Sequence, residues 1–127
     1  MSENIRVIIV DDEPELKQAL RLRLTSAGFS CEIASNGKEA LGLIARWQPR
    51  IIVTDLVMPD MNGYELCRRL QENEQTAAIP VIVLTAVPQH AVSRQDTLPS
   101  SVYVMHKPFD SKELIRTMRE LLQPQQS

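Results

Sequence analysis

The chain has 127 residues, which fits one domain of ordinary size, here expected to span residues 1–127. Hydrophobic residues make up 43% and charged residues 24%, so an apolar core can form without disulfides or a structural metal. The net charge of −2, with no run of Lys or Arg, argues against direct nucleic-acid binding.

Neither the cysteines nor the termini suggest a secreted or membrane protein. Cys31 and Cys67 are too few for a disulfide framework or a zinc site, and we interpret them as small core residues. The start of the sequence lacks the basic and apolar regions of a signal peptide, and no apolar run approaches the ~20 residues of a membrane span. The sequence therefore predicts a cytoplasmic protein with no membrane contact, a core over about residues 4–122 and a polar tail at 123–127.

The first expected strand, Ile5–Val10, is a nearly continuous run of β-branched apolar residues, which is typical of a strand covered on both faces. An amphipathic pattern follows it and predicts a helix that ends near Gly28. The core-facing residues expected on this helix are Leu16, Ala19, Leu20 and Leu24.

A second strand at 31–34 alternates polar and apolar residues, as expected at the edge of a sheet. The next helix is expected to end before Pro49, and a third, fully apolar strand covers 51–54. The core-facing residues expected on this second helix are Ala40, Leu41, Ile44 and Trp47.

A third helix is expected to begin just after Gly63, and a fourth strand follows at 81–84. Two prolines bracket the stretch 88–101 and limit it to a short fourth helix. A fifth, mixed strand at 102–106 precedes a final helix, for which Asp110 or Ser111 is the candidate N-cap. The apolar stripes of the third and final helices are Tyr64, Leu66, Cys67 and Leu70, and Leu114, Ile115, Met118, Leu121 and Leu122.

Strand and helix alternate five times, which predicts an α/β fold with a doubly wound, five-stranded parallel sheet and helices on both faces. The most apolar strands are the first, third and fourth, so they belong in the centre. This arrangement matches the flavodoxin-like strand order 2-1-3-4-5, in which ligands bind at the switch point between strands 1 and 3.

Carboxylates lie at that switch point. Asp11, Asp12 and Glu13 follow the first strand, and Asp55 follows the third. Neighbouring strands lie about 5 Å apart, so these acids should converge, repel one another and favour a bound cation. Mg²⁺ suits such a site, because it accepts one or two carboxylates, keeps several waters and binds phosphate oxygens.

Two further groups extend the chemistry of this edge. Thr85 ends the fourth strand and Lys107 follows the fifth, which adds a hydroxyl and an ammonium. Together with the acids they suit a phosphoryl group, and Asp55 is an ionised oxygen nucleophile that needs no general base. Each residue taken alone also has a structural explanation: acids favour helix starts, Asp55 could begin a turn, Thr85 could end a strand and Lys107 could lie in a solvent loop.

Four segments together resemble the response-regulator receiver family of two-component signalling, of the chemotaxis-regulator type. They are Val10–Pro14, Thr54–Gly63, Leu84–Ala86 and Lys107–Phe109. The resemblance covers essentially the whole chain. It implies a Mg²⁺ site formed by Asp12, Asp55 and the backbone carbonyl of Val57, with Asp11 acting through a metal-bound water.

The resemblance also implies how the site is used. Asp55 would be the phosphoacceptor, Lys107 would pair with the phosphoryl group, and Thr85 would move to hydrogen-bond it. A cis bond between Lys107 and Pro108 is implied as well.

Several positions depart from the family pattern. The switch position three residues before the lysine is usually aromatic; here it is Val104, and Tyr103 precedes it on the opposite face of a regular strand. Two variable positions that flank the site are also apolar, Val57 and Val87. The resemblance implies that such positions influence how water reaches the acyl phosphate. Neither valine can orient a hydrolytic water, so we expect a fairly long-lived phosphorylated state.

The leading hypothesis is a receiver that takes phosphate from a histidine kinase or a histidine phosphotransfer protein and changes its affinity for a downstream protein target or output domain. It would assist its own phosphorylation and dephosphorylation without being a turnover enzyme, and a homodimer is compatible with this role. The alternatives are a phosphorylation-independent interaction domain and a metal-dependent phosphatase or other hydrolase, although the latter lacks a second catalytic acid or base.

Overall fold

The computed structural model describes residues 5–58, 61–86 and 102–123. The described strands form one parallel sheet in the order β2-β1-β3-β4-β5, which confirms the predicted topology. The short helix expected within 88–101 lies outside the described residues. The strands are β1 Ile5–Val10, β2 Phe29–Ala34, β3 Ile51–Asp55, β4 Val81–Thr85 and β5 Val102–His106.

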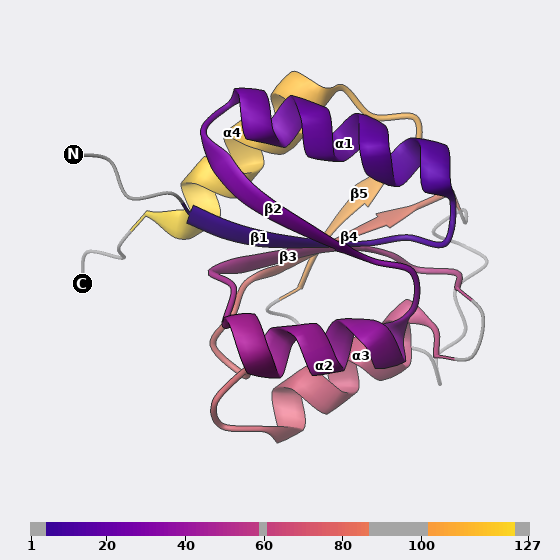
Figure 1. The fold of residues 1–127 in the computed structure, drawn as a ribbon, viewed down its shortest axis with the longest axis vertical. Coiled ribbons are helices and arrows are strands. Elements are labelled where there is room, and N and C mark those ends of the chain that lie inside the picture. The colour runs from indigo at the N-terminus through magenta and orange to yellow at the C-terminus, as the bar shows by residue number, and fades with distance from the viewer. Residues whose placement is uncertain (1–4, 59–60, 87–101, 124–127) are drawn as a thin grey trace.

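Helices cover both faces of the sheet, as a doubly wound fold requires. In Figure 1, α1 and α4 lie on one face, and α2 and α3 lie on the other. None of the described helices combines the length and apolar character needed to cross a membrane. The helices are α1 Pro14–Ser26, α2 Gly37–Trp47, α3 Gly63–Glu72 and α4 Ser111–Leu122.

Two apolar clusters, one on each face of the sheet, form the core. Successive β1 residues alternate between them: Ile8 belongs to the cluster beneath α2 and α3, and Ile9 belongs to the one beneath α1 and α4. The strand is apolar throughout because both of its faces are buried. Each large side chain buried in this way contributes about 1.5–3 kcal/mol.

The edge strand β2 begins at Phe29, two residues earlier than the sequence predicted. Phe29 is buried in the core beneath α1 and α4, in a stretch for which the sequence had predicted no strand. Cys31 is partly buried against the same cluster and Cys67 is fully buried, in agreement with their interpretation as small core residues.

One prediction for the core face of α1 is wrong. Ala19 is exposed, and Lys17 is buried in its place beside Leu20 and Leu24. Positions 17, 20 and 24 follow the helical spacing of the core face, whereas 19 lies off it.

Polar side chains fix the starts of three helices. Asn36 caps α2, Asn62 caps α3 and Asp110 caps α4, each accepting a backbone N–H of the first turn. After α1, Gly28 adopts φ of +101°, the left-handed conformation that glycine provides at helix ends.

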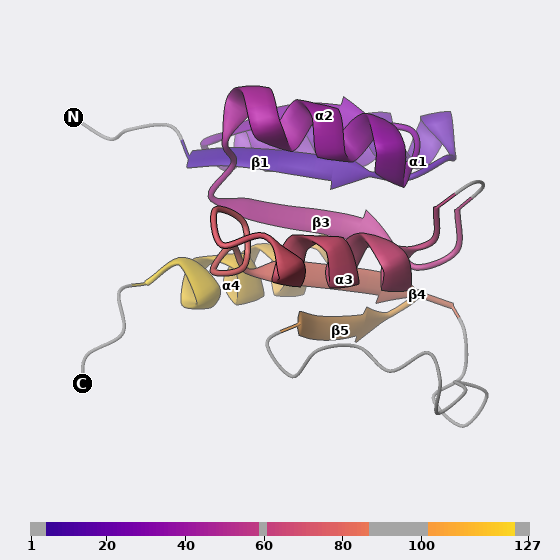
Figure 2. The ribbon, with the colours of Figure 1, turned by 90° about the horizontal axis from the view of Figure 1, so that it is seen from below.

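All five strands end at the same edge of the sheet. Figure 2 shows the strand arrowheads directed toward one side of the molecule. β3 ends at Asp55 and β4 at Thr85, and the segments after β1 and β5 emerge beside them. The predicted site residues therefore share one edge.

Candidate functional site

Three carboxylates meet at the carboxyl edge of the central strands. One oxygen each of Asp11, Asp12 and Asp55 lies within 4.8 Å of the others. Asp11 is 1% exposed and Asp55 7% exposed, whereas Asp12 faces solvent. The cluster is therefore an acidic site that is buried at Asp11 and Asp55 and open to solvent at Asp12.

Backbone contacts hold Asp55 in one orientation. Its Oδ1 accepts the N–H of Leu56 at 2.7 Å, which leaves Oδ2 directed toward the ammonium of Lys107. The loop after β3 passes close over the Asp55 backbone at Gly63, where a Cβ would lie 2.9 Å from the Asp55 carbonyl oxygen. The glycine permits this approach.

Asp11 is anchored at its backbone, but one of its oxygens accepts no hydrogen bond from the described residues. Its N–H donates to the Ala34 carbonyl at 3.1 Å, and its Oδ1 accepts the N–H of Glu13 at 2.8 Å. Its Oδ2 is buried without a hydrogen-bond partner among the described residues. Burial raises the pKa of Asp11, and the Asp55 charge adds to this effect, while the Glu13 N–H and the Lys107 charge oppose it.

Lys107 is the basic member of the site. Its Nζ lies 3.4 Å from Asp55 Oδ2 and 4.0 Å from Asp11 Oδ2. Its backbone N–H donates to the Thr85 carbonyl at 2.8 Å, and its peptide bond to Pro108 is cis, as the sequence resemblance implied. One ammonium cannot neutralise three carboxylates, so the cluster retains an excess of negative charge.

The residues present fit a hard divalent cation. All the clustered side-chain donors are carboxylate oxygens, which Mg²⁺ prefers. Oδ2 of Asp11, which accepts no hydrogen bond from the described residues, is a buried acceptor in the cluster, and the exposure of Asp12 leaves room for water ligands. Asp11, Asp12 and Asp55 could hold such an ion.

The structure thus brings together four of the residues that the sequence singled out: Asp11, Asp12, Asp55 and Lys107. Thr85 is buried at the end of β4 and is joined to Lys107 through its carbonyl. The side chain of Val57 is 62% exposed beside the site. Val87 lies outside the described residues.

Val104 and Tyr103 lie on a regular strand. β5 pairs with β4 in unbroken register from Val102 to His106, so no bulge moves Tyr103 into the place of Val104. Both side chains are exposed, Tyr103 by 44% and Val104 by 38%. The departure from the family pattern therefore persists in the fold.

Two contacts at the site and one buried residue near it were not predicted from the sequence. The Leu56 N–H and the close approach at Gly63 depend on the backbone geometry around Asp55, although both residues lie in the Thr54–Gly63 segment on which the resemblance rests. Lys17, buried near the start of α1, was detectable, since its spacing from Leu20 and Leu24 places it on the core face.

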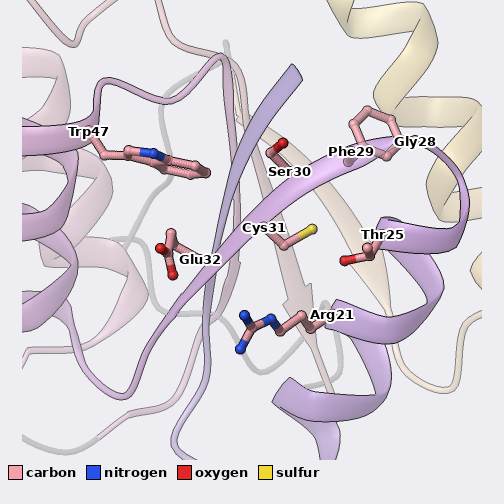
Figure 3. Close-up of a pocket in the computed structure, with 8 residues that line it drawn as sticks. All are labelled: Arg21, Thr25, Gly28, Phe29, Ser30, Cys31, Glu32 and Trp47. Carbon is pink, nitrogen blue, oxygen red and sulfur yellow. The ribbon is translucent and has the colours of Figure 1, made fainter. Parts of the chain in front are cut away.

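A separate pocket of about 430 Å³ lies at the edge strand β2, and none of Asp11, Asp12 and Asp55 lines it. Figure 3 shows Arg21 and Thr25 of α1 and Trp47 of α2 around it. Burial raises the pKa of the Cys31 thiol in this pocket, against an opposing hydrogen bond from Thr25, which favours the thiol over the thiolate. The pocket contains none of the predicted site residues. Its lining is Arg21, Thr25, Gly28, Phe29, Ser30, Cys31, Glu32 and Trp47.

Comparison with known proteins gives one consistent result. The sequence pattern of the response regulator receiver domain family matches residues 7–119. The chain is 34% identical over 117 residues to the DNA-binding dual master transcriptional regulator RpaA of Synechocystis, covering 92% of this chain and 48% of that protein. It is 37% identical over 115 residues to an uncharacterized 14.6 kDa protein of Leptolyngbya boryana, covering 90% and 87%.

Solved structures agree. The receiver domain of a signal transduction histidine kinase from Syntrophus aciditrophicus superposes with a TM-score of 0.82 at 30% identity, covering 92% of this chain and 89% of that one. The chain spans about half the length of several of the curated relatives it matches, RpaA among them.

Proposed function

This chain belongs to the response regulator receiver domain family, and from that premise we propose that it is a switch operated by phosphorylation of Asp55. One observation carries the proposal. A buried carboxylate that ends a central strand lies within 4.8 Å of two other carboxylates and 3.4 Å from an ammonium. Such a site combines a nucleophile, a cation site and a fixed positive charge.

Asp55 would act through the oxygen that its backbone contacts leave available. With Oδ1 held by the Leu56 N–H, Oδ2 attacks the phosphorus of a phosphohistidine donor. An Oδ2–P bond forms, the P–N bond breaks, and its electron pair stays on the departing imidazole nitrogen. No general base is needed, because the carboxylate is already ionised.

Asp12, Asp55 and the Val57 carbonyl would hold Mg²⁺, with Asp11 reaching the ion through water. When bound, Mg²⁺ would neutralise charge on the transferring phosphoryl oxygens. Two observations support this assignment: Asp11 Oδ2 accepts no hydrogen bond from the described residues, and Lys107 neutralises only part of the carboxylate charge. Mg²⁺ is thus the cofactor we assign to the site.

Lys107 and Thr85 would respond to phosphorylation of Asp55. The Lys107 ammonium transfers its contact from Asp55 Oδ2 to a phosphoryl oxygen, and the Thr85 hydroxyl moves in to hydrogen-bond the same group. Because the Lys107 N–H donates to the Thr85 carbonyl, a displacement of the backbone at Thr85 would also displace the backbone at Lys107. Val104 and Tyr103, which are exposed on the neighbouring strand β5, are the residues that we assign to passing that change to a partner surface.

The phosphorylated state should be long-lived. Val57 is exposed beside Asp55 and, like Val87, has no group that could orient a hydrolytic water. A decay half-life of seconds for the purified phosphoprotein would contradict this assignment.

The partners follow from the chemistry of the transfer. A histidine kinase or a histidine phosphotransfer protein supplies the phosphoryl group, and a downstream protein, an output domain or a second copy of the chain responds to it. Residues 4–122 would form the receiver unit, which would act as a signalling switch in the cytoplasm without turning over a diffusible substrate and without contacting nucleic acid itself.

Mass spectrometry after treatment with acetyl phosphate and Mg²⁺ tests the proposal. We expect one added phosphoryl group on the wild-type protein and none on Asp55→Asn. Asp12→Asn retains the nucleophile but loses a metal ligand, so it should need more Mg²⁺ for the same yield. Absence of modification with every donor would instead favour a phosphorylation-independent interaction domain, which the valine at position 104 makes the second candidate.

A further inference from the structure

A buried lysine lies on α1, one turn beyond the acidic residues. Lys17 is 7% exposed, although lysine is rarely buried without a charged partner. Its Nζ donates to the Ser35 hydroxyl at 2.6 Å and makes no ion pair with any described residue. A buried ammonium held by a neutral hydroxyl needs an explanation beyond packing.

Lys17 makes a second connection between the segment that carries Asp11 and Asp12 and the end of β2. Asp11 is tied by its N–H to the Ala34 carbonyl at 3.1 Å, and Lys17 is tied by its side chain to Ser35, the next residue. The Lys17 N–H also donates to the Glu13 carbonyl at 3.1 Å, which starts the helix. Asp12 lies in the stretch between these two attachments.

The two links have different consequences for the cluster. The Asp11 link fixes where the chain leaves β1, and the Lys17 link fixes how the first turn of α1 sits against the β2–α2 loop. Asp12 is the exposed member of the carboxylate cluster, so neighbouring side chains pack around it least. Its position depends on the backbone that these links hold.

We propose that Lys17 is a positioning residue for the metal site. By bonding to Ser35, it holds the first turn of α1 so that the Asp12 carboxylate stays beside those of Asp11 and Asp55. The inference rests on the proposed function, because it assigns Lys17 a role in the Mg²⁺ affinity of that same site.

Mg²⁺ titration followed by amide chemical shifts tests this role. Lys17→Met keeps the apolar stem and removes the donor, so the Mg²⁺ dissociation constant should rise about tenfold, as when supporting groups of metal ligands are removed. In the metal-free protein the Asp12 amide resonance should move as well. Ser35→Ala should weaken binding in the same direction, and the double variant should bind no more weakly than Lys17→Met alone.

Two controls separate positioning from charge and from stability. Lys38→Met removes an equal charge from the exposed first turn of α2 and should leave the dissociation constant unchanged. Leu24→Ala destabilises α1 through its core face, away from the acidic segment, and should lower the melting temperature without moving the Asp12 amide or the dissociation constant.

The outcomes distinguish the two claims. Wild-type affinity in both folded Lys17→Met and Ser35→Ala would overturn the role of Lys17 while leaving phosphorylation of Asp55 intact. If Lys17→Met does not fold, Ser35→Ala alone decides, and an unchanged dissociation constant overturns the inference. A wild-type protein that neither binds Mg²⁺ nor accepts phosphate would instead remove the proposed function on which the inference rests.

Discussion

Replacing Gly63 by alanine probes the close contact between the start of α3 and the backbone of Asp55. A Cβ at this position would lie 2.9 Å from both the Asp55 carbonyl oxygen and the Leu56 Cα, closer than van der Waals contact allows. The atoms it meets are backbone and cannot rotate away. Gly63 and its neighbours must therefore shift, and the shift falls on the segment that carries Asp55.

The size of the effect follows from a matched pair. Gly42, in the interior of α2, would place its Cβ in open space, so Gly42→Ala should stabilise the protein by about 0.5–1 kcal/mol through helix propensity alone. Gly63→Ala adds the same methyl group at the first residue of α3, where the gain in helix propensity is smaller, and creates a steric conflict typical of overpacking, about 1–3 kcal/mol. The two variants should therefore differ by about 1–3 kcal/mol, with Gly63→Ala the less stable.

Urea denaturation followed by far-UV circular dichroism measures both variants on one scale. Gly63 has no positive φ in the structure, so backbone strain does not confuse the comparison. The reasoning is refuted if Gly63→Ala unfolds at the same urea concentration as Gly42→Ala, because the loop would then tolerate the extra methyl group.

Three further predictions concern charge and capping. Asp11→Asn should be more stable than wild type at pH 7 by about 1 kcal/mol, because it removes a buried charge. Since burial raises the Asp11 pKa, this gain in stability should shrink as pH falls through the raised pKa and vanish below the ordinary value of 3.8. Melting temperatures of both proteins measured across pH would show this. Lys107→Met should lose about 1–3 kcal/mol, because Asp55 and Asp11 lose their shared cation, and Mg²⁺ should restore more stability to this variant than to wild type in thermal melts. Asn62→Ala should cost about 1 kcal/mol by removing the cap of α3, and urea denaturation at wild-type stability would contradict that.

The sequence determined the sheet and its active edge because both depend on patterns that run along the chain. Runs such as Ile5–Val10 are apolar throughout since both faces of a central parallel strand are covered, and helical periodicity separates them. Once the strand order is known, polar residues that end the strands must meet at one edge. Asp11, Asp55 and Lys107 could be placed together for that reason before any distance was known.

Tertiary structure alone decided what surrounds each group. Whether Asp11 Oδ2 finds a hydrogen-bond partner and how closely Gly63 approaches the backbone of Asp55 depend on packing between separate segments of the chain. Periodicity predicts which direction a side chain takes but not what it meets there. The atoms it meets set its solvation and hydrogen bonds, and these fix the charge, the pKa and the geometry of the site.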